Sequence, residues 1–522
     1  MLTQIKKFLI LDTHRLRNLI LVILFLSIIF SFQLFLRQKI SLNLFFLLTV
    51  LFSINYLCYI FYFSLEREKK YFPLYPLIIF YYLLTFTAYF YFDQDEYFFV
   101  QNEVMIKVII IISLGLFFFS LGYFIPNLFY KDKKDIILKD VDKYNALIIL
   151  GSYIFLIFIH INNYITYINL GFLDQLREPL TLLIVAILQL KYFEKKSLTL
   201  LFLNIFFITA LFFVELSSGS TVFSFLIILM VIAINYFKTK KLNLINISLI
   251  CYSVFFFHGI KNDIRDLNWV DKSNDKTLNK PYVILNDLVK DQILNDPSEN
   301  KTLNDSSENK TLNDPSKDKT IVTNLYDTYK VVTESVTDKE KLINSDSYAY
   351  QKYRFFHSNI TLQKALDLTP HAVKFLNGKS YKSIIYKPIP RFIYKDKPKE
   401  EWGNAFGQIY KILLSDDFIT SWNFPILSEF YSNFGFIGVI FGMLLLGLFS
   451  KILIFFTYSL NQSMLLTSMG YVVIFNLVYQ ESNLSLPIGK MINQILFFVA
   501  IICSVLIFNF FVKYFFRIIQ KT

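Results

Sequence analysis

Residues 105–128 read MIKVIIIISLGLFFFSLGYFIPNL and carry one charged side chain, Lys107. About 20 apolar residues in a helix are enough to cross the ~30 Å hydrocarbon core of a bilayer, so this run is long enough. A helix also bonds all of its own backbone amides, whereas an unpaired amide in lipid is costly. The stretch therefore predicts a membrane-spanning helix.

Similar apolar runs occur on both sides of this one, and together they predict an all-α polytopic membrane protein with about 12 transmembrane helices. The composition agrees, because 55% of the 522 residues are hydrophobic and the mean hydropathy is +0.47. Only 18% of the residues are charged, against about 25% in soluble proteins. The runs lie near 18–36, 41–64, 73–92, 105–128, 145–169, 179–194, 198–216, 221–237, 242–259, 430–457, 463–480 and 491–512.

The net charge of +12 first suggests a nucleic-acid partner, but the positions of the cations give another explanation. Lys and Arg gather in alternate loops, such as 131–143 and 238–241, whereas the loop at 93–96 is acidic. Under the positive-inside rule this alternation places both termini in the cytoplasm. Most of the excess charge is then topological, and no nucleic-acid partner is expected.

Residues 260–429 form the longest stretch without an apolar run, and by parity the loop is external. It contains a tandem repeat of nine residues, LNDPSENKT, LNDSSENKT and LNDPSKDKT, over 294–320. Each unit has one apolar residue and no glycine, so it cannot build a stacked core, and its composition predicts disorder. The expected organisation is transmembrane helices 1–9 in 1–259, the repeat-bearing loop in 260–345, an ordered loop in 346–429 and helices 10–12 in 430–522.

Two groups of residues are candidates for anion binding at the external face. Lys261 and Arg265 are four residues apart, so they lie on one helix face and can hold a diphosphate or anchor lipid headgroups. Gly219 and Ser220 precede a span, where they form either a tight hairpin or a turn that offers amides to an anion.

Residues 346–429 mix aromatic and cationic side chains, a combination that suits sugars and phosphates at a membrane surface. The candidates there are Arg354, His357, Lys387, Arg391 and Lys397. An interfacial amphipathic helix with an aromatic belt is the alternative interpretation of the segment around His357.

Residues 425–442 read PILSEFYSNFGFIGVIFG and open the closing spans. Gly435, Gly438, Gly442 and Gly447 recur at helical spacing and predict a close-packing helix face. Glu429 at the membrane surface is either a general base or a carboxylate that stabilises the helix N-terminus.

Taken in order, these features resemble the O-antigen and oligosaccharide repeat-unit polymerases of bacterial surface polysaccharide assembly. The matching residues are Gly219-Ser220, Lys261 with Arg265, Pro390-Arg391 with Lys397-Pro398, and 425–442. One departure is Thr221, since members of the family often carry Arg directly after Gly-Ser.

The resemblance implies a glycosyltransferase in the bacterial plasma (inner) membrane that transfers an undecaprenyl-diphosphate-linked glycan onto the non-reducing end of a lipid-linked repeat unit. Arg265 and Arg391, with Lys261, would hold the leaving diphosphate, and Glu429 would be the general base, with His357 or His258 as alternatives. The implied partners are the lipid-linked oligosaccharide, membrane lipid and a chain-length regulator protein; no cofactor or metal is expected. Further substrate contacts are expected from Arg354, Lys387, Lys397, Gly219, Ser220, Tyr431 and Asn433.

Three other activities remain alternatives. An O-antigen ligase has similar chemistry and stays open. A flippase for the same glycans is expected to bury charges at mid-span and to carry internal repeats, and the sequence indicates neither. A glycosyltransferase that uses a polyprenyl-phosphate sugar carries an acidic motif in its first external loop, but the loop near Arg37 and Lys39 has no carboxylate.

Overall fold

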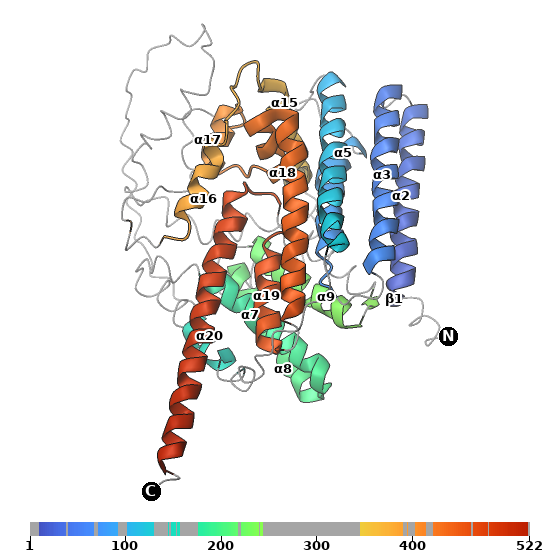
Figure 1. Ribbon diagram of the computed structural model, residues 1–522. Coiled ribbons are helices and arrows are strands. Elements are labelled where there is room, and N and C mark those ends of the chain that lie inside the picture. Colours follow the sequence, from blue (N-terminus) through green and yellow to red (C-terminus); the bar gives the residue numbers. More distant parts are fainter. Residues whose placement is uncertain are drawn as a thin grey trace, which may run out of the picture.

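The structure, a computed structural model of residues 1–522, is an assembly of helices (Figure 1). The residues that it describes are 10–37, 40–66, 71–91, 102–129, 145, 148–152, 154–156, 176–217, 221–239, 241–243, 345–389, 394, 402–413, 421–460, 463–478 and 480–519. The repeat at 294–320 and the expected span at 242–259 fall almost wholly outside these residues.

The described elements are nearly all helical. The first half contains β1 (Ile10–Asp12), α2 (Thr13–Leu36), α3 (Leu42–Glu66), α4 (Leu74–Thr87), η1 (Ala88–Tyr91), α5 (Asn102–Phe124), η3 (Ile125–Leu128), α7 (Arg177–Lys195), α8 (Leu198–Ser217), α9 (Thr221–Thr239) and β2 (Lys241–Asn243). The second half contains α15 (Ser345–Leu368), η7 (Lys379–Tyr381), α16 (Lys382–Tyr386), α17 (Trp402–Ile409), α18 (Ile426–Ser459), α19 (Met464–Phe475) and α20 (Ser485–Ile519). The short strands β1 and β2 pair antiparallel.

Five of the described helices are long and apolar enough to cross a membrane, which supports a multi-pass membrane protein. Shorter apolar helices correspond to four more expected spans. The long ones cover Arg15–Leu36, Leu42–Leu65, Glu103–Leu128, Ile426–Ser459 and Ser485–Val512, and the shorter ones Leu74–Thr87, Leu198–Phe212, Leu226–Thr239 and Met464–Phe475. The total of about 12 transmembrane helices stays a prediction.

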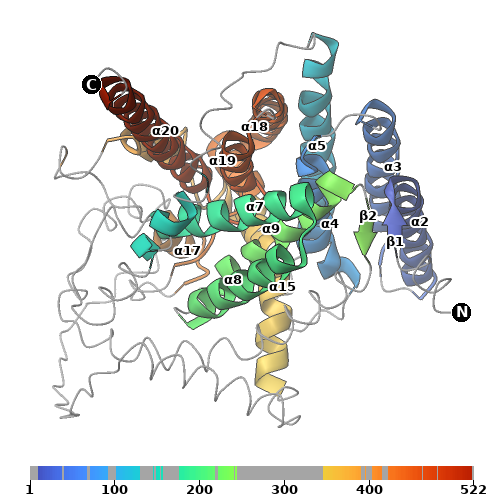
Figure 2. The ribbon, with the colours of Figure 1, turned by 90° about the horizontal axis from the view of Figure 1, so that it is seen from below.

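Helix α7 differs from the expected span at 179–194. Charged residues at both ends, among them Glu178 and Lys191, restrict its buried apolar stretch to 179–190. Figure 2 shows α7 and α8 along their length where α18 is nearly end-on, so these helices lie across α18. Buried amides join this layer, because Asn204 donates to Gln189 and Gln189 donates to Asn235.

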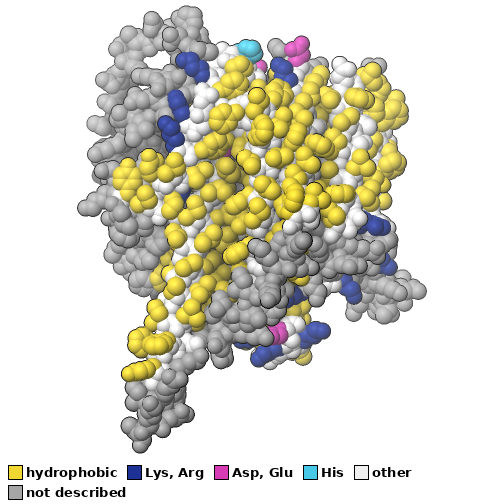
Figure 3. Space-filling model, viewed as in Figure 1, with side chains coloured by type: hydrophobic (Ala, Val, Ile, Leu, Met, Phe, Trp, Pro, Cys, Tyr) yellow, Lys and Arg dark blue, Asp and Glu magenta, His cyan; other side chains and the backbone are white. Residues whose placement is uncertain are grey.

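The outer surface of the long helices is apolar. Phe25 on α2, Phe46 on α3, Phe441 on α18 and Phe510 on α20 are each more than half exposed. Figure 3 shows a continuous hydrophobic face over these helices, with the charged side chains at its ends and along one edge. A surface of this kind suits lipid as the surrounding solvent.

Helices α5 and α18 pack with their backbones close together. A Cβ on Gly447 would clash with the carbonyl oxygen of Phe119, and one on Gly122 would clash with that of Leu444. Glycine is therefore required on both helices at this crossing. The expected close-packing role is confirmed for Gly447.

Gly435 has another role, because α18 is broken there. Phe434 and Gly435 have non-helical dihedral angles, and Gly435 lies at φ 63° and ψ −146°. Few residues other than glycine adopt this backbone region. The first two helical turns of α18 are thus separated by this break from the long apolar part that follows.

Candidate functional site

A cluster of buried polar residues, called the polar cluster below, lies where α4, α15, the segment before α18, the start of α18 and residues 480–485 meet. Helix α15 contributes a run of nearly inaccessible polar side chains, all at most 2% exposed: His357, Ser358, Asn359, Thr361 and Gln363. This run lies against α4, α5 and α18. The alternative of an interfacial amphipathic helix is therefore wrong for His357, because the side chain is enclosed by the bundle.

His357 is held between an indole and a carboxylate. Its ring lies 4.4 Å from the Trp422 ring, centroid to centroid. On the other side, Nδ1 is 3.6 Å from Oε1 of Glu481. Trp422 is fixed in turn, because its Nε1 donates to Thr361 Oγ1 at 2.9 Å. The imidazole therefore has a defined orientation beside an anionic group.

Glu429 is fully buried one turn into α18 and binds the same segment as His357. Its Oε2 accepts a hydrogen bond from the backbone N–H of Leu484 at 2.6 Å. The backbone N–H of Ile426 donates to the carbonyl oxygen of Gln480 at 3.1 Å. Residues 480–484 thus connect Glu429 on α18 to Glu481 and, through it, to His357 on α15.

The break in α18 places further polar groups beside Glu429. The carbonyls of Ser432 and Asn433 accept hydrogen bonds from the backbone N–H groups of Leu376 and Asn377. Asn433 Nδ2 donates to Ser380 Oγ at 2.9 Å, and its Oδ1 accepts from the N–H of Gly378 at 2.8 Å. The break is thereby locked to the loop 376–380, which satisfies carbonyls that a continuous helix would have bonded itself.

Two tyrosines of α4 extend the polar cluster. The hydroxyls of Tyr81 and Ser358 lie 3.1 Å apart, and the Tyr82 hydroxyl donates to Gln480 Oε1 at 3.0 Å. Tyr381 in η7 lies outside the membrane-spanning helices. Burial raises the pKa of its phenol well above the ordinary value, and the charge of Glu429 raises this pKa further. The Tyr381 phenol therefore stays protonated beside the charge of Glu429.

The sequence-predicted site residues divide into two groups. Glu429, His357 and Asn433 come together, while Tyr431 is one step removed, its hydroxyl donating to the Thr369 carbonyl at 3.3 Å. Lys387 lies elsewhere, with its stem against Gly489 of α20. Arg354 is part of α15. The remaining candidates fall outside the described residues: Lys261, Arg265, Arg391, Lys397, Gly219, Ser220 and His258.

Glu481 is a site residue that the sequence reasoning missed. It lies in the polar run QESN at 480–483, between two apolar stretches that end and begin close by. The position of this carboxylate directly after a predicted span is the signal that could have drawn attention to it. The side chain is 14% exposed, compared with 2% for His357, so Glu481 is the more accessible partner.

A second buried charge lies in the later part of α18. Lys451 is fully buried, and its Nζ lies 4.6 Å, 4.7 Å and 4.9 Å from the ring centroids of Tyr71, Tyr123 and Phe455. The ammonium group is therefore enclosed by ring faces inside the span expected near 430–457.

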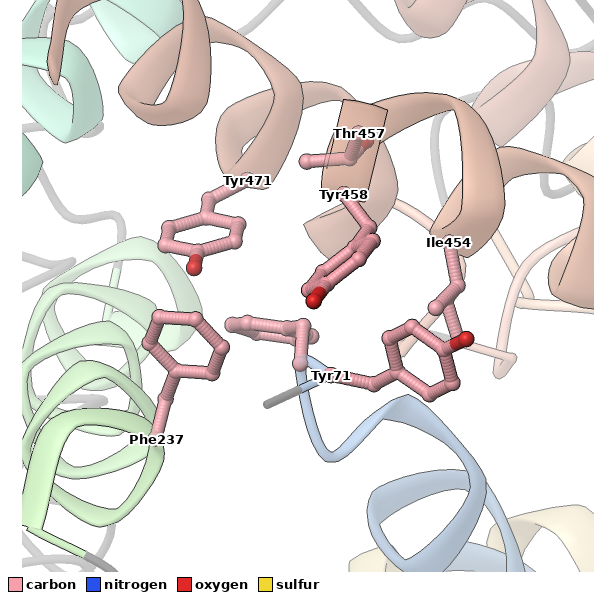
Figure 4. Close-up of a pocket in the computed structure, with 7 residues that line it drawn as sticks. Tyr71, Phe237, Ile454, Thr457, Tyr458 and Tyr471 are labelled. Atoms are coloured by element: carbon pink, nitrogen blue, oxygen red, sulfur yellow. The ribbon is translucent and has the colours of Figure 1, made fainter. Parts of the chain in front are cut away.

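A small pocket adjoins this cage. Tyr71, Phe237, Tyr458 and Tyr471 come from four different segments and surround it, as Figure 4 shows. Its volume of about 10 Å³ is room for about one water molecule. No sugar or diphosphate fits in a pocket of this size.

The chemistry that the polar cluster can supply is proton transfer. Across the residues that the structure describes, no three His, Cys, Asp or Glu side chains are grouped to hold a metal ion. A histidine oriented by a carboxylate can accept a proton from a hydroxyl, and tyrosine and serine hydroxyls can position a polar ligand. Comparisons with protein-family models, with curated proteins and with solved structures found no match to this chain.

Proposed function

We propose that this chain is a membrane glycosyltransferase that polymerises lipid-linked oligosaccharide repeat units at the outer face of a bacterial plasma membrane. The observation that carries the proposal is the convergence of His357 and Glu429, chosen from sequence as proton acceptors, on the single segment 480–484. Such a cluster inside an otherwise apolar bundle is a functional site by default.

The reaction requires a proton acceptor, and His357 suits this role best. The acceptor hydroxyl passes its proton to His357 as its oxygen bonds to the anomeric carbon of the donor. The bond from that carbon to the undecaprenyl diphosphate breaks, and its electron pair leaves with the diphosphate. Glu481 at 3.6 Å orients the imidazole and stabilises the imidazolium that forms.

Glu429 acts in positioning rather than as the base. It is fully buried, and one oxygen is engaged by the Leu484 N–H. Its role is to hold the segment that carries Glu481. The cations for the diphosphate are assigned from the sequence alone: Lys261, Arg265 and Arg391.

The topology belongs to the same proposal. Both termini lie in the cytoplasm, about 12 helices cross the membrane, and 260–429 is external. The polar cluster then faces the outer leaflet, where lipid-linked repeat units are available. A chain-length regulator is the expected protein partner.

A transporter of lipid-linked glycans is the second candidate, and two observations favour it. Helix α18 is discontinuous at Phe434 and Gly435, and broken helices form the substrate sites of many transporters. Lys451 is buried inside the same helix. The polymerase remains our first proposal because glycosyl transfer requires a proton acceptor, a role that His357 beside Glu481 suits.

Gene deletion followed by gel analysis of the surface glycan separates these activities. Loss of a polymerase leaves a single repeat unit on the lipid core, loss of a ligase leaves none, and loss of a flippase retains lipid-linked units on the cytoplasmic face. The variants Arg265→Ala and Arg391→Ala, at normal membrane abundance, are also expected to abolish the glycan ladder, the series of bands on the gel that correspond to increasing numbers of repeat units. Wild-type ladders in both variants would refute the cation assignment.

A further inference from the structure

The chain from 368 to 395 contains no Asp or Glu, although the charges of the whole stretch 260–429 nearly balance. Its described part carries four lysines: Lys374, Lys379, Lys382 and Lys387. We propose that this basic segment, 374–387, is an interfacial docking surface for the headgroups of anionic phospholipids. The proposal does not depend on the reaction that the protein catalyses.

The basic segment is anchored to two of the long apolar helices. At one end, Leu376 and Asn377 donate backbone hydrogen bonds to Ser432 and Asn433 at the break of α18. At the other end, the Lys387 stem lies on Gly489 of α20, where a Cβ would come within 2.8 Å of Lys387 Cδ. The segment therefore extends from α18 to α20, beside surfaces that suit lipid.

The side chains between these anchors are amphipathic. Ile385 is 72% exposed and Tyr386 37% exposed, although both belong to residue types that are usually buried. Lys374 and Lys382 are also exposed. Figure 3 shows Lys and Arg side chains along the edge of the apolar face, in the area where Figure 1 has α16 and α17. Exposed apolar residues among cations are typical of a segment in the headgroup layer.

Charge complementarity selects the occupant. Since the segment contains no Asp or Glu, its lysines give it a net positive charge, and each lysine near an anionic leaflet gains a favourable electrostatic free energy. Lysine stems also bury their methylenes at the interface while the ammonium groups reach phosphate. A soluble acidic protein would satisfy the cations but would leave Ile385 and Tyr386 in water.

The test uses full-length protein in nanodiscs, with Tyr386→Trp as a fluorescent reporter. The wild-type protein already contains Trp269, Trp402 and Trp422. The reporter signal is therefore the emission of the Tyr386→Trp protein minus the emission of the wild-type protein. Dibrominated phosphatidylglycerol in phosphatidylcholine discs is expected to quench this emission at least about twofold more than dibrominated phosphatidylcholine at equal mole fraction.

The triple variant Lys374→Gln/Lys379→Gln/Lys382→Gln is expected to remove the preference for phosphatidylglycerol, because the remaining Lys387 cannot sustain it. The matched control Lys195→Gln/Lys196→Gln/Lys241→Gln changes the same net charge elsewhere and keeps the preference. Equal quenching by the two lipids, or a preference that survives the first triple variant, would overturn the proposal.

Discussion

Helix α18 buries one charged side chain in each of its two parts, and the two environments differ in kind. Glu429, before the break, binds a backbone N–H and lies among hydrogen-bonding loops that also hold His357 and the partly exposed Glu481. Lys451, after the break, faces the rings of Tyr71, Tyr123 and Phe455 beside a pocket of about 10 Å³. We therefore expect the polar cluster, rather than the ring-lined cage of Lys451, to be the functional site, because it combines hydrogen-bonding groups with the partly exposed Glu481.

The largest effect is expected from Glu429→Ala. The change leaves the buried Leu484 N–H without its acceptor, at a cost of about 1–3 kcal/mol, and releases the segment that carries Glu481. We expect both the unfolding temperature of the purified protein and the length of the glycan ladder to decrease.

Glu429→Gln is the matched control, since its amide oxygen can still accept from Leu484. We expect it to restore most of the stability and much of the ladder if Glu429 acts in positioning. A stable Glu429→Gln protein with no ladder would make Glu429 the base instead.

A loss of stability without release of the segment that carries Glu481 is expected from Gly435→Ala. The backbone at φ 63° is strained for any residue with a Cβ, at about 1–3 kcal/mol, and the new methyl would approach the Phe375 ring at 3.3 Å. Chemical denaturation of the purified protein measures this loss in the free energy of unfolding.

Gly151→Ala is the control for this substitution, because nothing lies within 4 Å of the Cβ position of Gly151. If the two variants were equally stable, the break in α18 would not be required for the native structure.

Lys451→Met is expected to be nearly neutral, within about 1 kcal/mol. The lost cation–π attraction is offset because no charge then has to be buried. A loss of the glycan ladder in a folded Lys451→Met protein would mean that the cage takes part in function.

No effect is expected from deletion of the repeat at 294–320, whose polar composition predicts that it adds nothing to a core. Ladder length and protein abundance after deletion check this. An inactive, normally abundant deletion variant would contradict the sequence interpretation of the repeat.

The helical class and the long spans could be predicted, because a 24-residue apolar run such as 105–128 leaves the backbone few alternatives in lipid. Glu429 and His357 could be proposed from their neighbours in sequence. Their meeting on 480–484 could not, since it depends on α15 entering the bundle as a buried polar helix. The break at Gly435 could not be predicted for a similar reason. The spacing of Gly435 from the following glycines is that of a close-packing helix face, and the hydrogen bonds to residues 376–377, which mark a helix break, are visible only in the structure.

The most direct test of the proposed centre uses proteoliposomes that contain purified protein and the lipid-linked repeat unit extracted from the gene-deletion strain. The wild type is expected to lengthen the glycan, and His357→Ala and Glu481→Gln, folded and equally reconstituted, are expected to leave single units. Chain growth at the wild-type rate in either variant would contradict the assignment of the His357 and Glu481 pair as the catalytic centre.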